Sequence, residues 1–460
     1  MPLVNVGIAT STKDDLPEAA KEAAKKAKEQ LKGKTPKLLM FFCVFTYPPE
    51  TYQKALEAIY EVFDNKDIPL VGGNVLGFFA KDRYYFDVEM FGKGLARIMK
   101  GLARVIPQLR FKGASLIALH SDYFSVGTGI GKDAFKNPQK AGEACIKMAL
   151  ENLEYNPSIA YLAMLKKGAK DITRFRPLSA LLLTPGMTPQ KELLDQEMID
   201  GIVSFAKRTL RLAGGGVSDG VAVRITKDGH LFFNKEVHKE AVISVVFGSD
   251  LEIGYGIATG AEALPERVVI TKAKGHIVYE LNQRPPIEVL REIYEKYSDK
   301  KIEDFLNLEM YLMLKGYVMG ITDLKGGFYW PFVFTEIVEG KYLRAFFPMK
   351  EGVGLSFVRV TPQSAQKATI QAVKDMIEDA KTDDFGFVFF ASCALRGQIL
   401  GRKYLQEMEV IKETLKNKNL PVFGICSNGE QATYKTSEPR ASSFSISMMG
   451  ISNRLISEIG

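Results

Sequence analysis

Hydrophobic residues recur in one order at three places along the chain, and the first lies near the N-terminus. A continuous apolar run over residues 38–45 is bounded by prolines, which predicts a strand buried on both faces. The next segment places four apolar residues on one helical stripe: Tyr52, Leu56, Ile59 and Phe63. The run "IPLVGGNVLG", residues 68–77, then ends in a glycine loop. This order predicts a β-α-β unit with two parallel strands.

The same order returns twice. The second copy reads "SALLLTPG", a helix over 195–210 and the loop "LAGGGVSDG"; the third reads "FGFVFFASC", a helix over 401–417 and "LPVFGICSNG". Each copy follows an amphipathic helix led by a proline (Pro17, Pro138 or Pro362), a residue favoured in a first helical turn. Each is also followed by a further apolar run. The pattern therefore predicts an α/β fold of mixed elements, with three related β-α-β modules and extra material within residues 221–360.

The three glycine loops are the candidate ligand site, because loops at the carboxyl ends of parallel strands converge. Glycine leaves backbone amides uncovered, and short polar side chains add hydrogen bonds. The residues predicted to bind a ligand are Gly73, Asn74, Gly215, Gly216, Ser218, Asp219, Ser427, Asn428 and Glu430.

The predicted ligand is a small polar molecule of amino-acid type. Its carboxylate would meet the amides of Gly215 and Gly216, and its amine would meet Asp219 or Glu430. The alternative is that the loops are tight turns whose polar residues face water.

Composition narrows the function classes. Hydrophobic residues make up 46% and charged residues 25%, as in ordinary globular proteins. The net charge of +7 is small for 460 residues, so no nucleic-acid partner is expected. No apolar run reaches the length of a membrane span, and no signal peptide is evident. Four cysteines without a Cys-x-x-Cys pair fit a reducing compartment, so we expect a cytoplasmic protein.

Catalytic motifs are weak. The stretch "SVGTGIGKD", residues 125–133, lacks the first glycine and the final Ser or Thr of a phosphate loop, and is expected to connect a strand to the next helix. The histidines show no metal-ligand spacing, although His120 at a strand end could reach a site. Cys393 and Cys426 end two predicted neighbouring strands, and their thiols could lie close together. A hydrolytic or redox enzyme using Cys393, Cys426 or Glu430 therefore stays open beside a binding protein, with no catalytic or metal residue assigned.

The order and spacing of these segments resemble the FIST family of sensory proteins. The resemblance rests on "PLVGGNVLG", "GGGVSDG", "FNKEVHKEAVISVVFG", "ITKAKG", "FASCALRGQILG" and "VFGICSNGEQA". It implies two consecutive domains, a FIST N-like domain over 1–225 and a FIST C-like domain over 226–460. It also implies a sensor of small molecules such as amino acids.

Two departures from the family pattern refine this expectation. Some relatives bind haem, but "GYGIATGAEALP" before the "ITKAKG" segment holds no His or Trp, so haem is not expected and no cofactor is predicted. The chain leaves no room for a fused output module, so the signal would pass to a separate protein partner.

Overall fold

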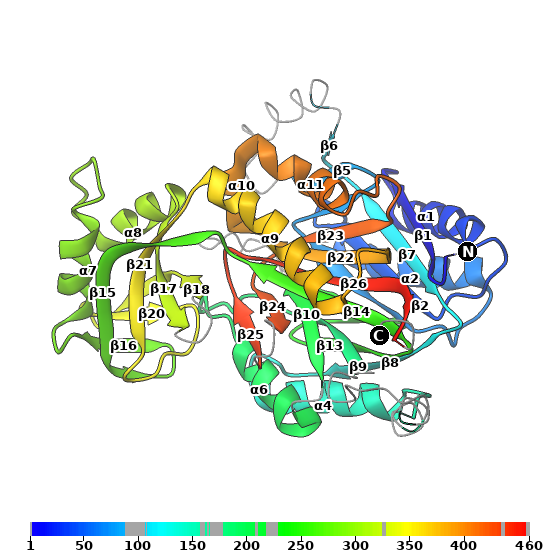
Figure 1. The fold of residues 1–460 in the computed structure, drawn as a ribbon, viewed down its shortest axis with the longest axis horizontal. Coiled ribbons are helices and arrows are strands. Elements are labelled where there is room, and N and C mark those ends of the chain that lie inside the picture. The colour runs from blue at the N-terminus through cyan, green and yellow to red at the C-terminus, as the bar shows by residue number, and fades with distance from the viewer. Residues whose placement is uncertain are drawn as a thin grey trace.

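A computed structural model describes residues 2–87, 106, 108–156, 162, 165, 178–207, 210–217, 229–323, 328–433 and 438–456. Within these ranges the chain forms three similar modules and one inserted sheet (Figure 1).

The first module confirms the predicted β-α-β unit. Its elements are β1 (Asn5–Ser11), α1 (Leu16–Gln30), β2 (Leu38–Val44), α2 (Tyr52–Phe63), β3 (Leu70–Val75) and β7 (Ala114–His120). Strands β2 and β3 pair in parallel, whereas β7 pairs antiparallel with β2 and β1 antiparallel with β7. The apolar run of β2 is buried along its whole length, as a strand covered on both faces requires.

The second module repeats this order of elements. They are β8 (Phe124–Gly131), α4 (Pro138–Glu151), β9 (Leu178–Thr184), α6 (Asp195–Ala206), β10 (Arg211–Gly216) and β13 (Val242–Ser249). Its two inner strands, β9 and β10, pair in parallel as predicted.

The third module has β14 (Leu251–Ala258), α9 (Pro362–Ala380), β22 (Phe385–Cys393), α10 (Ala394–Leu400), α11 (Glu407–Thr414), β23 (Val422–Ser427) and β26 (Ile446–Leu455). Strands β22 and β23 again pair in parallel. The single helix predicted over 401–417 is wrong at its start. Gly401 takes a positive φ of 55°, which ends α10, and a 3₁₀ turn over Gly401–Gln406 precedes α11.

The modules are interlocked by exchanged hairpins. After its glycine loop each module forms a hairpin: β4–β5 (Gly77–Ala80 and Arg83–Phe86), β11–β12 (Leu231–Phe233 and Glu236–His238) and β24–β25 (Glu430–Thr433 and Pro439–Ser442). The first strand of each hairpin pairs with a different module: β11 with β3, β24 with β10 and β4 with β23. The exchange closes a ring, since the first module completes the third, the second completes the first and the third completes the second.

One hydrophobic core lies inside this ring. It joins buried side chains of all three modules, among them Phe41, Leu183 and Phe389. The module helices lie on the outside of the sheets (Figure 1). The core therefore belongs to no single module.

The first strand of each module, which the sequence analysis missed, packs its glycines against the first helix. In β8, a Cβ at Gly131 would lie 1.9 Å from the Ala141 carbonyl oxygen, and one at Gly129 would lie 2.1 Å from that of Cys145. Only glycine permits this approach to the helix backbone. The expectation that residues 125–133 form a connection is thus wrong, because these glycines lie within a strand.

These first strands are sheet edges, and the first helix protects them. Ile8, Thr128 and Tyr255 occupy equivalent positions, opposite Ile117, Val245 and Met449 of the neighbouring strand. The Gln30 side chain accepts from the Ile8 N–H (3.1 Å) and donates to its carbonyl (3.0 Å). Likewise Asn152 donates to the Thr128 carbonyl (3.0 Å), and Asp379 accepts from the Tyr255 N–H (2.9 Å). Satisfied edge groups resist pairing with other chains.

The inserted sheet lies between β14 and α9. Its strands are β15 (Ala261–Lys274), β16 (Ile277–Leu281), β17 (Tyr317–Asp323), β18 (Phe328–Phe332), β19 (Phe334–Val338), β20 (Tyr342–Ala345) and β21 (Gly354–Val360). Two helices accompany the sheet, α7 (Pro286–Tyr294) and α8 (Phe305–Leu314). It projects to one side of the ring (Figure 1) and contacts the second module where His276 meets Glu197 at 3.3 Å. The predicted domain boundary at 225/226 stays a prediction, and strands from both sides of it pair together.

Replacing Gln30 with alanine should lower the free energy of unfolding by about 1 to 3 kcal/mol, because both backbone groups of buried Ile8 lose a partner. Denaturant titration measures this loss. The neighbouring exposed Glu29 serves as the control, and Glu29→Ala should change stability by less than about 0.5 kcal/mol. Equal stabilities for the two variants would contradict this role of Gln30.

Candidate functional site

The second and third glycine loops meet, as the sequence analysis predicted. Gly215 lies opposite Glu430 in the β10–β24 ladder. The Gly216 N–H donates to the Gly429 carbonyl (2.9 Å), and the Asn428 N–H donates to the Gly216 carbonyl (3.3 Å). A Cβ at Gly215 would lie 2.9 Å from the Ser427 Cβ, so glycine is needed for the loops to approach. Five predicted site residues are thus brought together: Gly215, Gly216, Ser427, Asn428 and Glu430.

The first loop lies at another junction. Gly73 pairs with Leu231 of β11, and the Asn74 N–H donates to the His230 carbonyl (3.0 Å). Gly73 and Asn74 therefore lie where the first and second modules meet, whereas the five residues above lie where the second and third modules meet. Ser218 and Asp219 lie outside the described residues.

Glu430 is fully buried where the second and third modules meet. Its carboxyl group accepts from the Ser427 hydroxyl (2.6 Å), the Ser445 hydroxyl (2.8 Å) and the Ser445 N–H (3.3 Å). Burial raises the pKa of Glu430 to about 8, because the charged form is poorly solvated. These hydrogen bonds link the end of β23, the start of β24 and the residue just before β26.

The ring contains three equivalent positions at the carboxyl ends of the inner strands, marked by the first residue of Tyr52–Phe63, Asp195–Ala206 and Glu407–Thr414. At the second position, buried Asp195 accepts from the Gln431 amide (2.7 Å), which also donates to Thr184 (3.2 Å). Burial raises the pKa of Asp195 to about 7. The second carboxylate oxygen of Asp195 and the side-chain oxygen of Gln431 are buried without a hydrogen-bond partner among the described residues.

At the third position a buried arginine meets a buried glutamate. Arg396, which is fully buried, donates to the Glu407 carboxylate (2.7 Å) and to the Thr369 hydroxyl (2.9 Å). A buried charge pair of this kind is stable only when hydrogen bonds support it, as Thr369 does here.

The first position instead holds a cavity of about 400 Å³. Its described lining is Phe45, Thr46, Tyr47, Pro48, Pro49, Tyr52, Asn74, His230 and Lys239. The volume falls within the range of small-molecule sites. Among these described lining residues, Lys239 is the one with a permanent charge.

Hydrogen bonds fix the polar wall of this cavity. The Asn74 amide donates to the Tyr52 hydroxyl (3.0 Å), and its carbonyl accepts from the His230 N–H (2.6 Å). Tyr52 in turn donates to the Tyr47 carbonyl (3.1 Å) and packs edge-on against the His230 ring, with centroids 5.3 Å apart. Burial holds the pKa of both Tyr47 and Tyr52 well above the usual range, so these phenols stay neutral. The wall is therefore rigid and uncharged, with aromatic faces.

The sequence analysis selected Asn74 but missed Tyr52, His230 and Lys239. Tyr52 was visible only as an apolar position of a helical stripe. His230 and Lys239 come from the second module and reach the cavity through the exchanged hairpin, which no local pattern announces.

The cysteines do not form the pair that the sequence allowed. The β22–β23 register places Cys426 opposite Ser392 and Cys393 opposite Ser427, so the two thiols point to opposite faces of the sheet. Both side chains are buried, and burial raises the pKa of Cys426 to about 11 and that of Cys393 well above its usual range. Neither is a ready thiolate at neutral pH.

His120 lies away from these positions. Its ring contacts the Thr35 carbonyl (2.6 Å) and the carboxylate of exposed Asp122 (3.3 Å). Within the described ranges no three His, Cys, Asp or Glu side chains gather as metal ligands would.

Glu430→Gln should weaken the dependence of stability on pH. The unfolded chain releases the Glu430 proton near pH 4.5, whereas the folded protein keeps it until about pH 8, so the free energy of unfolding falls between these values. Glutamine cannot titrate and keeps the shape, so the variant should lose less stability over this interval. Asp195 adds a decline of its own to both proteins.

Urea unfolding at about pH 5, 6, 7 and 8 measures this difference. Glu61→Gln, at an exposed position, is the control and should follow the parent. Parallel curves for parent and Glu430→Gln would show that Glu430 is ionised in the fold.

Comparison with known proteins identifies the family. Residues 101–284 match the FIST N domain and residues 286–433 the FIST C domain. No helix of the described ranges has both the length and the hydrophobicity of a bilayer span. Comparison with curated proteins finds no match.

Solved structures give distant likenesses. A cyanuric acid hydrolase is 9% identical, covering 98% of this chain and 100% of that one, at a TM-score of 0.28. One from A. caulinodans is also 9% identical, covering 54% and 72% at a TM-score of 0.24. Scores this low assign no activity. The domain matches span most of the chain: it belongs to the FIST family, whose domains are recognised as sensory domains of signal transduction.

Proposed function

We propose that this protein is a sensor that binds a small, amino-acid-like carboxylate in the cavity beside Gly73 and Asn74. One observation carries the proposal. The cavity of about 400 Å³ lies beside the carboxyl ends of β2 and β3, at the start of α2. An open position at the carboxyl ends of parallel strands is where ligands commonly bind.

The lining favours a carboxylate joined to an apolar group. Lys239 supplies a positive charge at the mouth, while Phe45, Pro48 and Pro49 form an apolar wall. The fixed amide of Asn74 adds one orienting polar group. The ligand would also order the exchanged hairpin, because His230 lines the cavity just before β11.

The signal passes to a separate protein partner, and the protein acts in the cytoplasm. Its four cysteines are all unpaired in the fold, which suits a reducing compartment. The enzyme alternative has weaker support, because Cys393 and Cys426 are buried and protonated.

Screening amino acids and related carboxylates by thermal shift, followed by calorimetry, tests the proposal. Lys239→Gln should weaken binding of a ligand so found by about tenfold, through loss of one charge-assisted contact. Lys301→Gln, at an exposed position of the inserted sheet, should leave the affinity unchanged.

The same titration separates the two candidate positions. If the ligand binds in the cavity, Glu430→Gln keeps the parent affinity. If Glu430→Gln weakens binding and Lys239→Gln does not, the ligand lies near Glu430, between the second and third glycine loops. The cavity assignment is then wrong.

We also propose that the protein carries no haem, since "GYGIATGAEALP" forms most of β14 and holds no His. Purified protein incubated with haemin should show no stoichiometric Soret band. A band abolished by one His substitution would overturn this expectation.

A further inference from the structure

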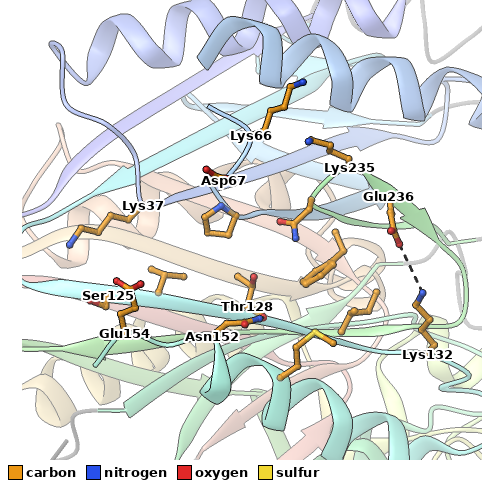
Figure 2. Close-up of a pocket in the computed structure, with 16 residues that line it drawn as sticks. Lys37, Lys66, Asp67, Ser125, Thr128, Lys132, Asn152, Glu154, Lys235 and Glu236 are labelled. Carbon is orange, nitrogen blue, oxygen red and sulfur yellow. Dashed lines mark hydrogen bonds and ion pairs between the residues drawn. The ribbon is translucent and has the colours of Figure 1, made fainter. Parts of the chain in front are cut away.

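A second open space lies at the opposite end of the junction between the first and second modules. It is a groove of about 940 Å³ (Figure 2). One wall carries Lys66, Asp67 and Lys235, and the other carries Ser125, Thr128 and Asn152 (Figure 2). The ion pair between Lys132 and Glu236, 4.0 Å apart, closes one end.

The groove exists because this junction departs from the internal repeat. At the second–third junction the equivalent of Thr128 is Tyr255, whose ring is covered by the Arg211 guanidinium at 4.7 Å and whose hydroxyl donates to the Arg211 carbonyl (3.4 Å). The bond between Tyr85 and Thr10 (2.9 Å), by contrast, joins β5 to β1 within the first module. Tyr255 thus bridges the second–third junction, whereas the shorter Thr128 lines the groove at the first–second junction.

Apolar and charged side chains both line the groove. Val126, Ile130 and Phe233 are apolar lining residues, while Lys37, Lys66 and Lys235 are basic ones, of which Lys37 also donates to the Phe124 carbonyl (2.7 Å). Of the lining carboxylates, Glu236 is already paired with Lys132, which leaves Asp67 and Glu154. A lining that combines apolar and charged side chains is compatible with a protein interface.

The groove and the cavity are joined by one short strand. His230, just before β11, lines the cavity, and Phe233, the last residue of β11, lines the groove. All three residues of β11 pair with β3, so they move with its backbone. Strand β11 therefore connects the two spaces.

We infer that this groove is a docking site for an extended, acidic segment of a partner protein, with alternating apolar residues that fill the floor. The lysines favour acidic side chains, and the volume of about 940 Å³ favours a segment rather than a compact ion. The link between docking and sensing rests on the proposed function; the docking itself does not.

Fluorescence anisotropy on the full chain tests the docking without any cavity ligand. The probes are labelled eight-residue peptides in which Leu alternates with Glu, with Lys or with Ser. The acidic peptide should bind at least about tenfold more tightly than the basic one and should weaken as salt is raised. Equal binding of the acidic and basic peptides would overturn the inference.

Two variants locate the site. The double variant Lys66→Glu, Lys235→Glu should weaken the acidic peptide by about tenfold or more, whereas Lys301→Glu on the inserted sheet should not. Thr128→Tyr, which restores the residue of the second–third junction, should remove binding at an unchanged unfolding midpoint. Peptide binding that survives the double variant would contradict this site. If inorganic pyrophosphate binds as tightly as the peptide and displaces it, the groove is a small-anion site and not a peptide groove.

Adding a cavity ligand separates this inference from the proposed function. A change in peptide affinity on ligand addition supports the link through β11. If the peptide binds but its affinity does not respond to a bound ligand, the docking site stands and the link through β11 is wrong.

Discussion

The exchange of hairpins between modules is the interaction on which the rest of the structure depends. Strands β3, β10 and β23 would each be a sheet edge within its own module, with unpaired backbone groups next to a buried core. The partner strand supplied by another module satisfies those groups, at Gly73–Leu231, Gly215–Glu430 and Cys426–Gly77. Because the exchange is cyclic, no module can be completed without the other two, and the inner core is common to all of them.

This arrangement places the starts of α2, α6 and α11 at the carboxyl ends of the inner strands. Asp195 bonds to Gln431 at the second of them, and Arg396 bonds to Glu407 at the third. At the opposite end Tyr255 bridges the second and third modules through Arg211. The junction of the first and second modules is open at both ends. A single junction therefore offers a cavity and a groove on either side of strand β11, which is a suitable arrangement for a sensory protein.

Local sequence patterns predicted the repeated part of the fold well. The parallel pairs, the proline-led helices and the meeting of the second and third loops all follow from apolar runs, helical stripes and glycines. The first strands escaped prediction because Gly127, Gly129 and Gly131 are typical of loops when read locally. Their reason is a helix backbone that lies against them in the fold. The cavity residues His230 and Lys239 escaped because their place depends on pairing between β11 and β3, which are distant in sequence.

Native-state hydrogen exchange tests the interlocked ring most directly. If each sheet is completed by another module, the amides of β3, β10 and β23 should open together, with one free energy equal to that of global unfolding. The slowest amides of all three strands should then share one dependence on denaturant. Exchange of one module's strand at a clearly lower free energy, with the other two still protected, would show that the modules fold separately and would contradict the account.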